Sequence, residues 1–410
     1  MFRARVLGAV AAAALTAATP VLAAPRPPGM KPAPDSAEAG LWDVMDKAER
    51  QARRSAELNA DPALNAYVRG VVCKVAGEHC GDIRLYVMDR PFFNASMAPN
   101  GFSEVWSGLL LRCDSESELA FVLGHEVAHF TENHSIEAHE ADKKRRNTAM
   151  VFAVGIAVIG AVAAAGSADP QSAQSIIDAT GSLVDAVYLA SISSYFSFSR
   201  EHETEADTLG LQRMAAVGYS PGAGATAWRA TIEETAKSDF KRKREADTRL
   251  GIFDSHPLSS VRAEALATRA ATMPTANGPA PNGHRAAIRP FLGAWLKDDL
   301  RRRDFGETLH IITRLSRNGE DLGVLNFYRG EVYRQRGKEG DLKLAAEAYG
   351  AATEQADAPA AAWRELGEAR RRTGDRTGAK AALETYLSRA SEAEDAWMVR
   401  ETLDALSKGD

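Results

Sequence analysis

Two histidines, His125 and His129, stand four residues apart within the mostly apolar run 123–130, and they constrain this chain's fold most strongly. Positions i and i+4 of an α-helix lie one above the other on one face, so both imidazoles can reach a single metal ion. Glu126 points about 100° around the helix from His125, where it can hold a water on that ion rather than bind the ion itself. The pattern predicts a helix over about 116–139 that carries a metal site.

A catalytic zinc site also needs a third protein ligand and one open position for water. Glu203 and Asp207 supply carboxylates at positions i and i+4 of a second predicted helix, over about 196–217. The first carboxylate can bind the metal, and the second can accept the free N–H of a histidine ligand and so fix its tautomer. The alternative is an acidic helix face exposed to solvent. The other histidines nearby are predicted to be surface groups: His134, His139 and His202.

The N-terminus has the three parts of a secretory signal peptide. Arg3 and Arg5 precede an apolar, Ala-rich stretch at 6–15, Pro20 breaks the helix, and a cut is expected after Ala23. The alternative is an uncleaved anchor helix. The predicted divisions of the chain are a signal peptide at 1–23, a Pro-rich tether at 24–35, a domain with the metal site at 36–270, a linker at 271–290 and a helical repeat domain at 291–410.

Composition narrows the classes of protein that fit. Apolar residues make up 45% and charged residues 26% of 410, an ordinary balance for a globular chain of two or three domains. The net charge of −5 argues against a nucleic-acid binder.

In an oxidising compartment Cys73 and Cys80 can close a small disulfide, or both can stay reduced. Cys113 is then left over, and no C-x-x-C spacing suggests a thiolate zinc site.

A repeat is present near the C-terminus. Gly330 and Gly337 recur as Gly367 and Gly374, 37 residues later. Trp363, followed three and four residues later by Leu and Gly, fits the opening of a tetratricopeptide unit. Small residues at such positions let two helices pack closely, and stacked helix pairs form a solenoid. A generic helical bundle is the alternative.

The pattern H-E-x-x-H at 125–129, followed by S-R-x-x-E-x-x-A-D at 199–207 and by His-Pro at 256–257, resembles the HtpX and CAAX-prenyl-protease group. These are gluzincins of metallopeptidase family forty-eight, and the resemblance covers roughly 39–270. With its signal peptide and repeats, the chain is most similar to the periplasmic, BepA-like branch. The resemblance implies an α+β, mostly helical gluzincin domain with a small sheet, followed by an all-α tetratricopeptide-type solenoid.

The resemblance also implies roles for individual residues. The ligands of one Zn²⁺ ion are His125, His129 and Glu203; the general base is Glu126; and Asp207 supports a ligand histidine. His256 and Arg262 are expected close to the metal, where either can stabilise the oxyanion. His256 can instead fill the open metal position and keep the enzyme latent. The two roles predict opposite changes in rate when His256 is replaced by Ala.

Four further segments carry predictions. Strands are expected at 83–88 and, with its exit, at 102–111, and the segment 94–98 is expected to contact substrate backbone along a sheet edge. The stretch 149–166 contains 18 consecutive apolar or glycine residues, within the lower range for a membrane-spanning helix. Because His129 and Glu203 must bind one ion, they must lie on the same side of any membrane. A single membrane-spanning helix between them is therefore excluded. The stretch is predicted to be a helix packed near the active site, or else a hairpin that dips into the bilayer surface.

These observations predict an exported zinc metalloendopeptidase that hydrolyses protein substrates in cell-envelope quality control. The repeats are expected to bind a protein partner, the location to be periplasmic, and contact with the membrane, if any, to be peripheral. The alternative is a chaperone or scaffold of envelope proteins with a latent protease site. The intact base Glu126 counts against this alternative.

Overall fold

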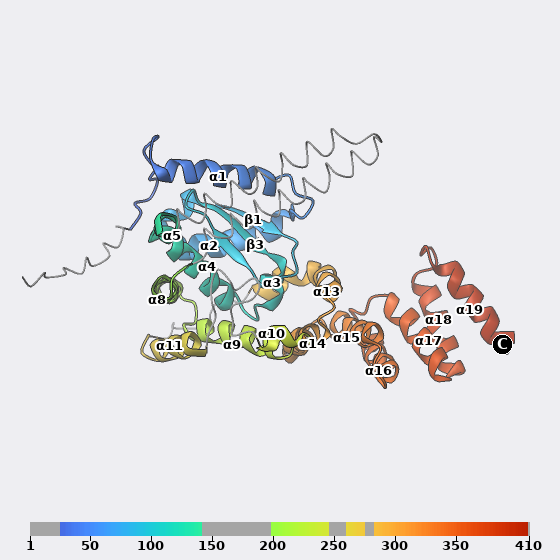
Figure 1. Ribbon diagram of the computed structural model, residues 1–410. Coiled ribbons are helices and arrows are strands. Elements are labelled where there is room, and N and C mark those ends of the chain that lie inside the picture. The colour runs from blue at the N-terminus through green and yellow to red at the C-terminus, as the bar shows by residue number, and fades with distance from the viewer. Residues whose placement is uncertain (1–24, 142–197, 246–259, 275–282, 409–410) are drawn as a thin grey trace, which may run out of the picture.

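The computed structural model describes residues 25–141, 198–245, 260–274 and 283–408. Helices dominate, and one small sheet lies among the helices of the N-terminal half (Figure 1). The predicted mostly helical α+β class is therefore confirmed. The predicted signal peptide at 1–23, the apolar stretch 149–166 and His256 lie outside the described residues. Among the helices that are described, none has the length and apolarity needed to cross a membrane.

The sheet has three strands in the order β1-β3-β2. β1 runs parallel to β3, whereas β2 runs antiparallel to it. Val87 of β1 pairs with Val105 of β3, and both side chains are fully buried, so the middle of the sheet is apolar. The strands are β1 (Arg84–Met88), β2 (Ala95–Met97) and β3 (Phe102–Trp106).

Both predicted strands are present, although the second is shorter than expected. β3 stops at Trp106, and residues 107–111 belong to the short helix α3 (Ser107–Arg112). β2 is not among the predicted strands, because three residues are too few to show an alternating pattern. It lies within the segment 94–98, which is predicted to contact substrate.

Two helices precede the sheet: α1 (Ala37–Ala52) and α2 (Pro62–Ala76). Asp61 accepts a hydrogen bond from the backbone N–H of Leu64 and caps α2, and Pro62 occupies the first turn, where a missing N–H costs nothing. Cys73 and Cys80 form a disulfide that links the end of α2 to the following turn. Cys113 is buried with a free thiol.

The segment before α1 is predicted to be a tether, but its beginning is packed against the rest of the protein. Arg26 is 3% exposed. Its backbone N–H donates to Thr131 O over 2.7 Å, and its guanidinium donates to Glu38 over 2.7 Å and to Asn133 over 3.1 Å. The side chain also lies over the Phe130 ring, at 5.2 Å from the centroid. The beginning of the segment is therefore fastened to the body of the protein.

The central helix is α4 (Glu116–Thr131), and every one of its residues is buried. Ser115 caps it by accepting from the backbone N–H of Glu118. The predicted single helix over 116–139 is wrong at this point, because the chain breaks at Asn133, whose φ is +61°. Asn tolerates this left-handed conformation better than most residues. A second helix, α5 (His134–Ala141), then starts in a new direction.

Helix α8 (Arg200–Ala216) crosses α4 at two glycines, and this crossing positions the site. A Cβ built on Gly210 would lie 2.8 Å from the backbone nitrogen of His125, and one built on Gly124 would lie 3.1 Å from the Gly210 carbonyl oxygen. Only glycines allow this approach. Two further helices cover α4 and α8: α9 (Gly222–Ala236) and α11 (Ser260–Ala271). The short helix α10 (Lys241–Glu245) follows α9.

The C-terminal part is entirely helical, and Figure 1 shows its last helices extending away from the sheet. The predicted linker 271–290 is partly a packed helix, because His284 and Ile288 are at most 1% exposed. The helices are α12 (His284–Ile288), α13 (Leu292–Arg301), α14 (Phe305–Leu315), α15 (Leu322–Arg336), α16 (Asp341–Thr353), α17 (Ala361–Thr373), α18 (Arg376–Arg389) and α19 (Ala396–Lys408).

The first of these helices share one hydrophobic core with the sheet and α4. Buried charges reinforce the contact: Arg112 of α3 donates to Glu234 of α9 over 2.8 Å and to Asp299 of α13 over 2.6 Å. All three side chains are at most 6% exposed. Helices α12 to α14 are therefore joined to the N-terminal half.

A separate core holds the last helices together. Gly330 of α15 lies against the ring of Tyr349 on α16, and Gly367 of α17 lies against Leu383 on α18. The repeated glycines are thus the points of closest approach within two helix pairs, as the repeat pattern predicts. The division into domains at 270 and 291 stays a prediction.

The α4–α8 crossing generates a first prediction. Replacing Gly210 by Ala places a methyl group against the backbone of α4, so the free energy of unfolding should fall by roughly 1–3 kcal/mol. Urea unfolding measures this change. Gly350→Ala is the matched control, since nothing lies within 4 Å of a Cβ there; it should be neutral or slightly stabilising. Equal stability of Gly210→Ala and the wild type would contradict the close crossing.

Candidate metal centre

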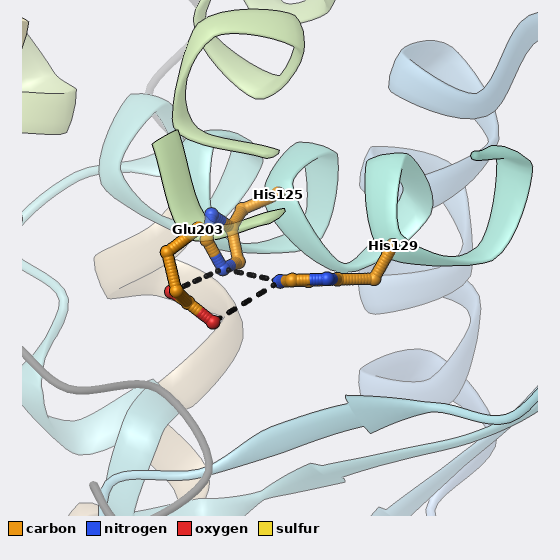
Figure 2. A group of neighbouring side chains, drawn as sticks. All are labelled: His125, His129 and Glu203. Atoms are coloured by element: carbon orange, nitrogen blue, oxygen red, sulfur yellow. Dashed lines mark hydrogen bonds and ion pairs between the residues drawn. The ribbon is translucent and has the colours of Figure 1, made fainter. Parts of the chain in front are cut away.

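Helices α4 and α8 bring His125, His129 and Glu203 together, as Figure 2 shows. The Nε2 atoms of the two histidines lie 3.0 Å apart, and each lies 3.5 Å from one carboxylate oxygen of Glu203. All three residues are at most 2% exposed. His129 and Glu203 are 74 positions apart in the sequence, so residues distant along the chain form this group.

The group fits a zinc ion in its chemistry and its spacing. Two imidazoles and one carboxylate make up the ligand set of many catalytic zinc sites. Bonds of about 2.0–2.2 Å at tetrahedral angles place neighbouring ligand atoms about 3.3–3.6 Å apart, close to the distances observed. Charge balance agrees as well: Glu126, Glu203 and Asp207 carry three formal negative charges against one positive charge on Arg262, and a divalent cation would balance the remaining two.

Asp207 lies beside the imidazole of His125. Its Oδ1 is 3.1 Å from His125 Nδ1, so a proton on Nδ1 would leave the lone pair of Nε2 free toward Glu203, as the predicted role of Asp207 requires. Trp228 of α9 donates to the same oxygen over 3.3 Å. Burial raises the pKa of Asp207, but hydrogen bonds from Arg262 and His125 outweigh this effect and hold the pKa at about 2. The carboxylate is thus ionised at any ordinary pH.

Arg262 joins the two carboxylates of α8. Its Nη1 forms an ion pair with Glu203 over 2.6 Å, and its Nε and Nη2 donate to the two oxygens of Asp207 over 2.7 and 2.8 Å. Its guanidinium also lies 5.5 Å from the centre of the Trp228 ring. These contacts place Arg262 beside the candidate ligand, as the resemblance implies. Its role as an oxyanion donor stays a prediction, and so does every role of His256.

Glu126 is 3% exposed and directly follows His125 on α4. Helix geometry turns its side chain about 100° from that of His125, and its role as the general base stays a prediction. The edge strand β2 lies close to α4. The backbone N–H of Trp106 donates to Asn94 O over 3.0 Å. This hydrogen bond helps to fix the register of β2 against β3.

The sequence reasoning missed His134. This histidine is 1% exposed, and its Nδ1 lies 2.9 Å from Nδ1 of the candidate ligand His129. Burial and the neighbouring His202 lower the pKa of His134 to about 3. The ring of His202 stacks on it at 4.3 Å, and Phe198 stacks on His129 at 3.8 Å. The prediction that His134 is a surface group is therefore wrong. The signal in the sequence that could have indicated this position is Asn133, because Asn often ends a helix and so redirects the residue that follows it.

Comparison with known proteins assigns the region that carries this site. The sequence pattern of peptidase family M48 matches residues 59–270, just over half of the 410-residue chain. The matched residues include α4, α8 and α11, and thus the ligand candidates, Glu126, Asp207 and Arg262.

Individual relatives agree with this match. The beta-barrel assembly-enhancing protease of Shigella flexneri is 27% identical over 228 residues, 55% of this chain and 42% of that protein. The mitochondrial metalloendopeptidase OMA1 of Schizosaccharomyces pombe is 33% identical over 144 residues, 35% of this chain and 36% of that protein. The chain therefore matches less than half the length of these curated relatives.

The geometry predicts how metal content depends on single residues. Replacing His125, His129 or Glu203 by Ala should abolish stoichiometric zinc binding, because two ligands hold the ion too weakly. Asp207→Ala should keep some zinc with roughly 10–100-fold weaker affinity, since only the orientation of His125 is lost. Elemental analysis and titration against a chelator measure both effects. Unchanged metal content in the three Ala variants would exclude this site.

Proposed function

Because this chain belongs to peptidase family M48, we propose that it is an exported zinc metalloendopeptidase that hydrolyses protein substrates in cell-envelope quality control. The observation that carries the proposal is the convergence of His125, His129 and Glu203 inside the region matched by the family. The names of the relatives, a protease that enhances beta-barrel assembly and a metalloendopeptidase, support the reaction class and the role. The predicted signal peptide supports a periplasmic location.

The reaction is metal-assisted hydrolysis of a peptide bond. A zinc ion held by these three residues would supply Lewis-acid chemistry, which polarises a carbonyl and lowers the pKa of water. Glu126 accepts the proton of the attacking water and delivers it to the leaving amine. Asp207 keeps Nε2 of His125 available as a ligand, and Arg262 holds the carboxylates of Glu203 and Asp207 in place. The buried setting strengthens each of these electrostatic contacts.

Substrate would bind in an extended conformation beside β2. This strand is at the edge of the described sheet and lies against α4, which carries the site. An edge strand offers unpaired backbone groups, so a substrate segment can add to it as a further strand. The segment 94–98 would then bind substrate backbone, which fits a peptidase that accepts varied side chains.

The C-terminal helix pairs would bind a protein partner or position the substrate. The pairs α15–α16 and α17–α18, followed by α19, extend from the sheet-containing half (Figure 1). Stacked pairs of this kind form an extended surface that suits protein recognition. Peripheral contact with a membrane through residues 149–166 is part of the proposal as well.

A substitution of the base separates a protease from a scaffold. Glu126→Gln keeps the size of the side chain and removes its basicity, so cleavage of an unfolded protein should fall by roughly 10²–10⁴. Zinc content should stay at the wild-type level. Cleavage assays with equal amounts of zinc-loaded protein measure the difference.

The matched control is Glu140→Gln, an exposed glutamate on α5, which should cleave at the wild-type rate. If Glu126→Gln retains the proteolytic rate of the wild type, the protease mechanism fails. If it loses proteolysis yet supports every function of the protein in cells, the scaffold role is the important one.

A further inference from the structure

We propose that His134 is a positioning residue for the metal ligand His129, and that Arg26 acts on the same ligand by holding the turn that presents His134. The inference rests on the metal site of the proposed function. It assigns roles to two residues outside the ligand motifs, one of them in the segment that precedes the first helix.

His134 lies between the ligand and a carboxylate. Its Nδ1 is 2.9 Å from His129 Nδ1, and its Nε2 is 3.2 Å from an oxygen of Glu205 on α8. The imidazole is 1% exposed, whereas the side chain of Glu205 is 36% exposed. A row of three polar groups therefore leads from the surface to the metal ligand.

The chemistry of these groups fixes the direction of both hydrogen bonds. An ionised carboxylate only accepts, so Nε2–H of His134 donates to Glu205. Nδ1 of a neutral His134 then has a lone pair and accepts from Nδ1–H of His129. This leaves a lone pair on Nε2 of His129, the nitrogen that faces Glu203. The opposite order would put a proton on that Nε2 and prevent metal binding. His134 thus does for His129 what Asp207 does for His125.

The turn at Asn133 makes this contact possible. Residues i and i+5 of a continuous α-helix point about 140° apart, so His134 could not reach the ring of His129 in an unbroken helix. With φ of +61°, Asn133 ends α4 and turns the chain, and α5 starts with His134 against His129.

Arg26 fastens this turn from outside. Its backbone N–H donates to Thr131 O over 2.7 Å, which satisfies a carbonyl at the end of α4. Its Nε donates to the side-chain oxygen of Asn133 over 3.1 Å, in a buried pair. Glu38 accepts from the same guanidinium over 2.7 Å and balances its charge. The N-terminal segment is thus connected to the metal ligand through Asn133 and His134.

Zinc affinity tests the role of His134, using competition with a chromogenic chelator and purified full-length protein. His134→Leu removes the acceptor and should weaken zinc binding roughly 10–100-fold. His134→Asn keeps an oxygen near the position of Nδ1 and should recover most of the affinity. The visible spectrum of the Co²⁺-loaded protein should change in the Leu variant and resemble the wild type in the Asn variant.

Controls exclude a general loss of structure. His310→Leu removes a half-buried histidine on α14 and should bind zinc normally. Thermal unfolding of the metal-free variants shows that each is folded; if the Leu variant is not, His134→Gln, whose oxygen is displaced, replaces it. Wild-type affinity in the Leu (or Gln) variant overturns the proposal, and so does equal weakening in that variant and the Asn variant.

A double-mutant comparison tests the role of Arg26. Arg26→Met keeps the apolar stem over Phe130 and removes the hydrogen bonds, so it should weaken zinc binding in the wild-type background. In the His134→Leu background it should have no further effect, because both changes act through one contact. Arg54→Met, at an exposed arginine, is the control. No loss in the wild-type background, or an equal loss in both backgrounds, contradicts the connection through His134.

His125→Ala separates failure of this inference from failure of the proposed function. If His125→Ala binds zinc as tightly as the wild type, the metal site itself is wrong. If His125→Ala loses zinc while His134→Leu keeps wild-type affinity, the metal site stands and only the role of His134 is rejected.

Discussion

The close crossing of α4 and α8 is the contact on which the rest of the site depends. At Gly124 and Gly210 the two backbones approach so closely that no side chain fits between them. The crossing sets the histidines of one helix opposite the carboxylates of the other, one turn apart along each axis. A pair of i, i+4 motifs then becomes a single buried group. Without this approach, Glu203 would be an ordinary acidic residue on a helix surface.

Burying these groups has a large electrostatic cost. Glu126, Glu203 and Asp207 are each at most 3% exposed, and ionised carboxylates in such a setting must be neutralised or paired. Arg262 offsets part of the cost through its contacts with Glu203 and Asp207. A divalent cation would offset the remainder. The ion is therefore expected to stabilise the fold as well as to support the chemistry, because metal binding and folding are coupled.

The grouping of the candidate ligands could be predicted from sequence because the motifs that carry them are local. His125 and Glu203 belong to i, i+4 motifs whose helical geometry follows from spacing alone. His134 could not be predicted in this way, because its contact depends on a single left-handed residue, Asn133, that redirects the chain. Arg26 lies in a Pro-rich segment with no periodicity, and only tertiary packing shows that it is buried. Long-range contacts of this kind cannot be recognised from the local sequence pattern.

The central claim is that two histidines, oriented by neighbours on their far nitrogens, bind zinc together with a carboxylate. X-ray absorption at the zinc edge of the purified protein tests it most directly. The account predicts nitrogen and oxygen neighbours at about 2.0–2.2 Å, with outer scattering from at least two imidazoles. It also predicts that His129→Ala changes this spectrum. A sulfur neighbour at about 2.3 Å, or a spectrum without imidazole scattering, would contradict the account.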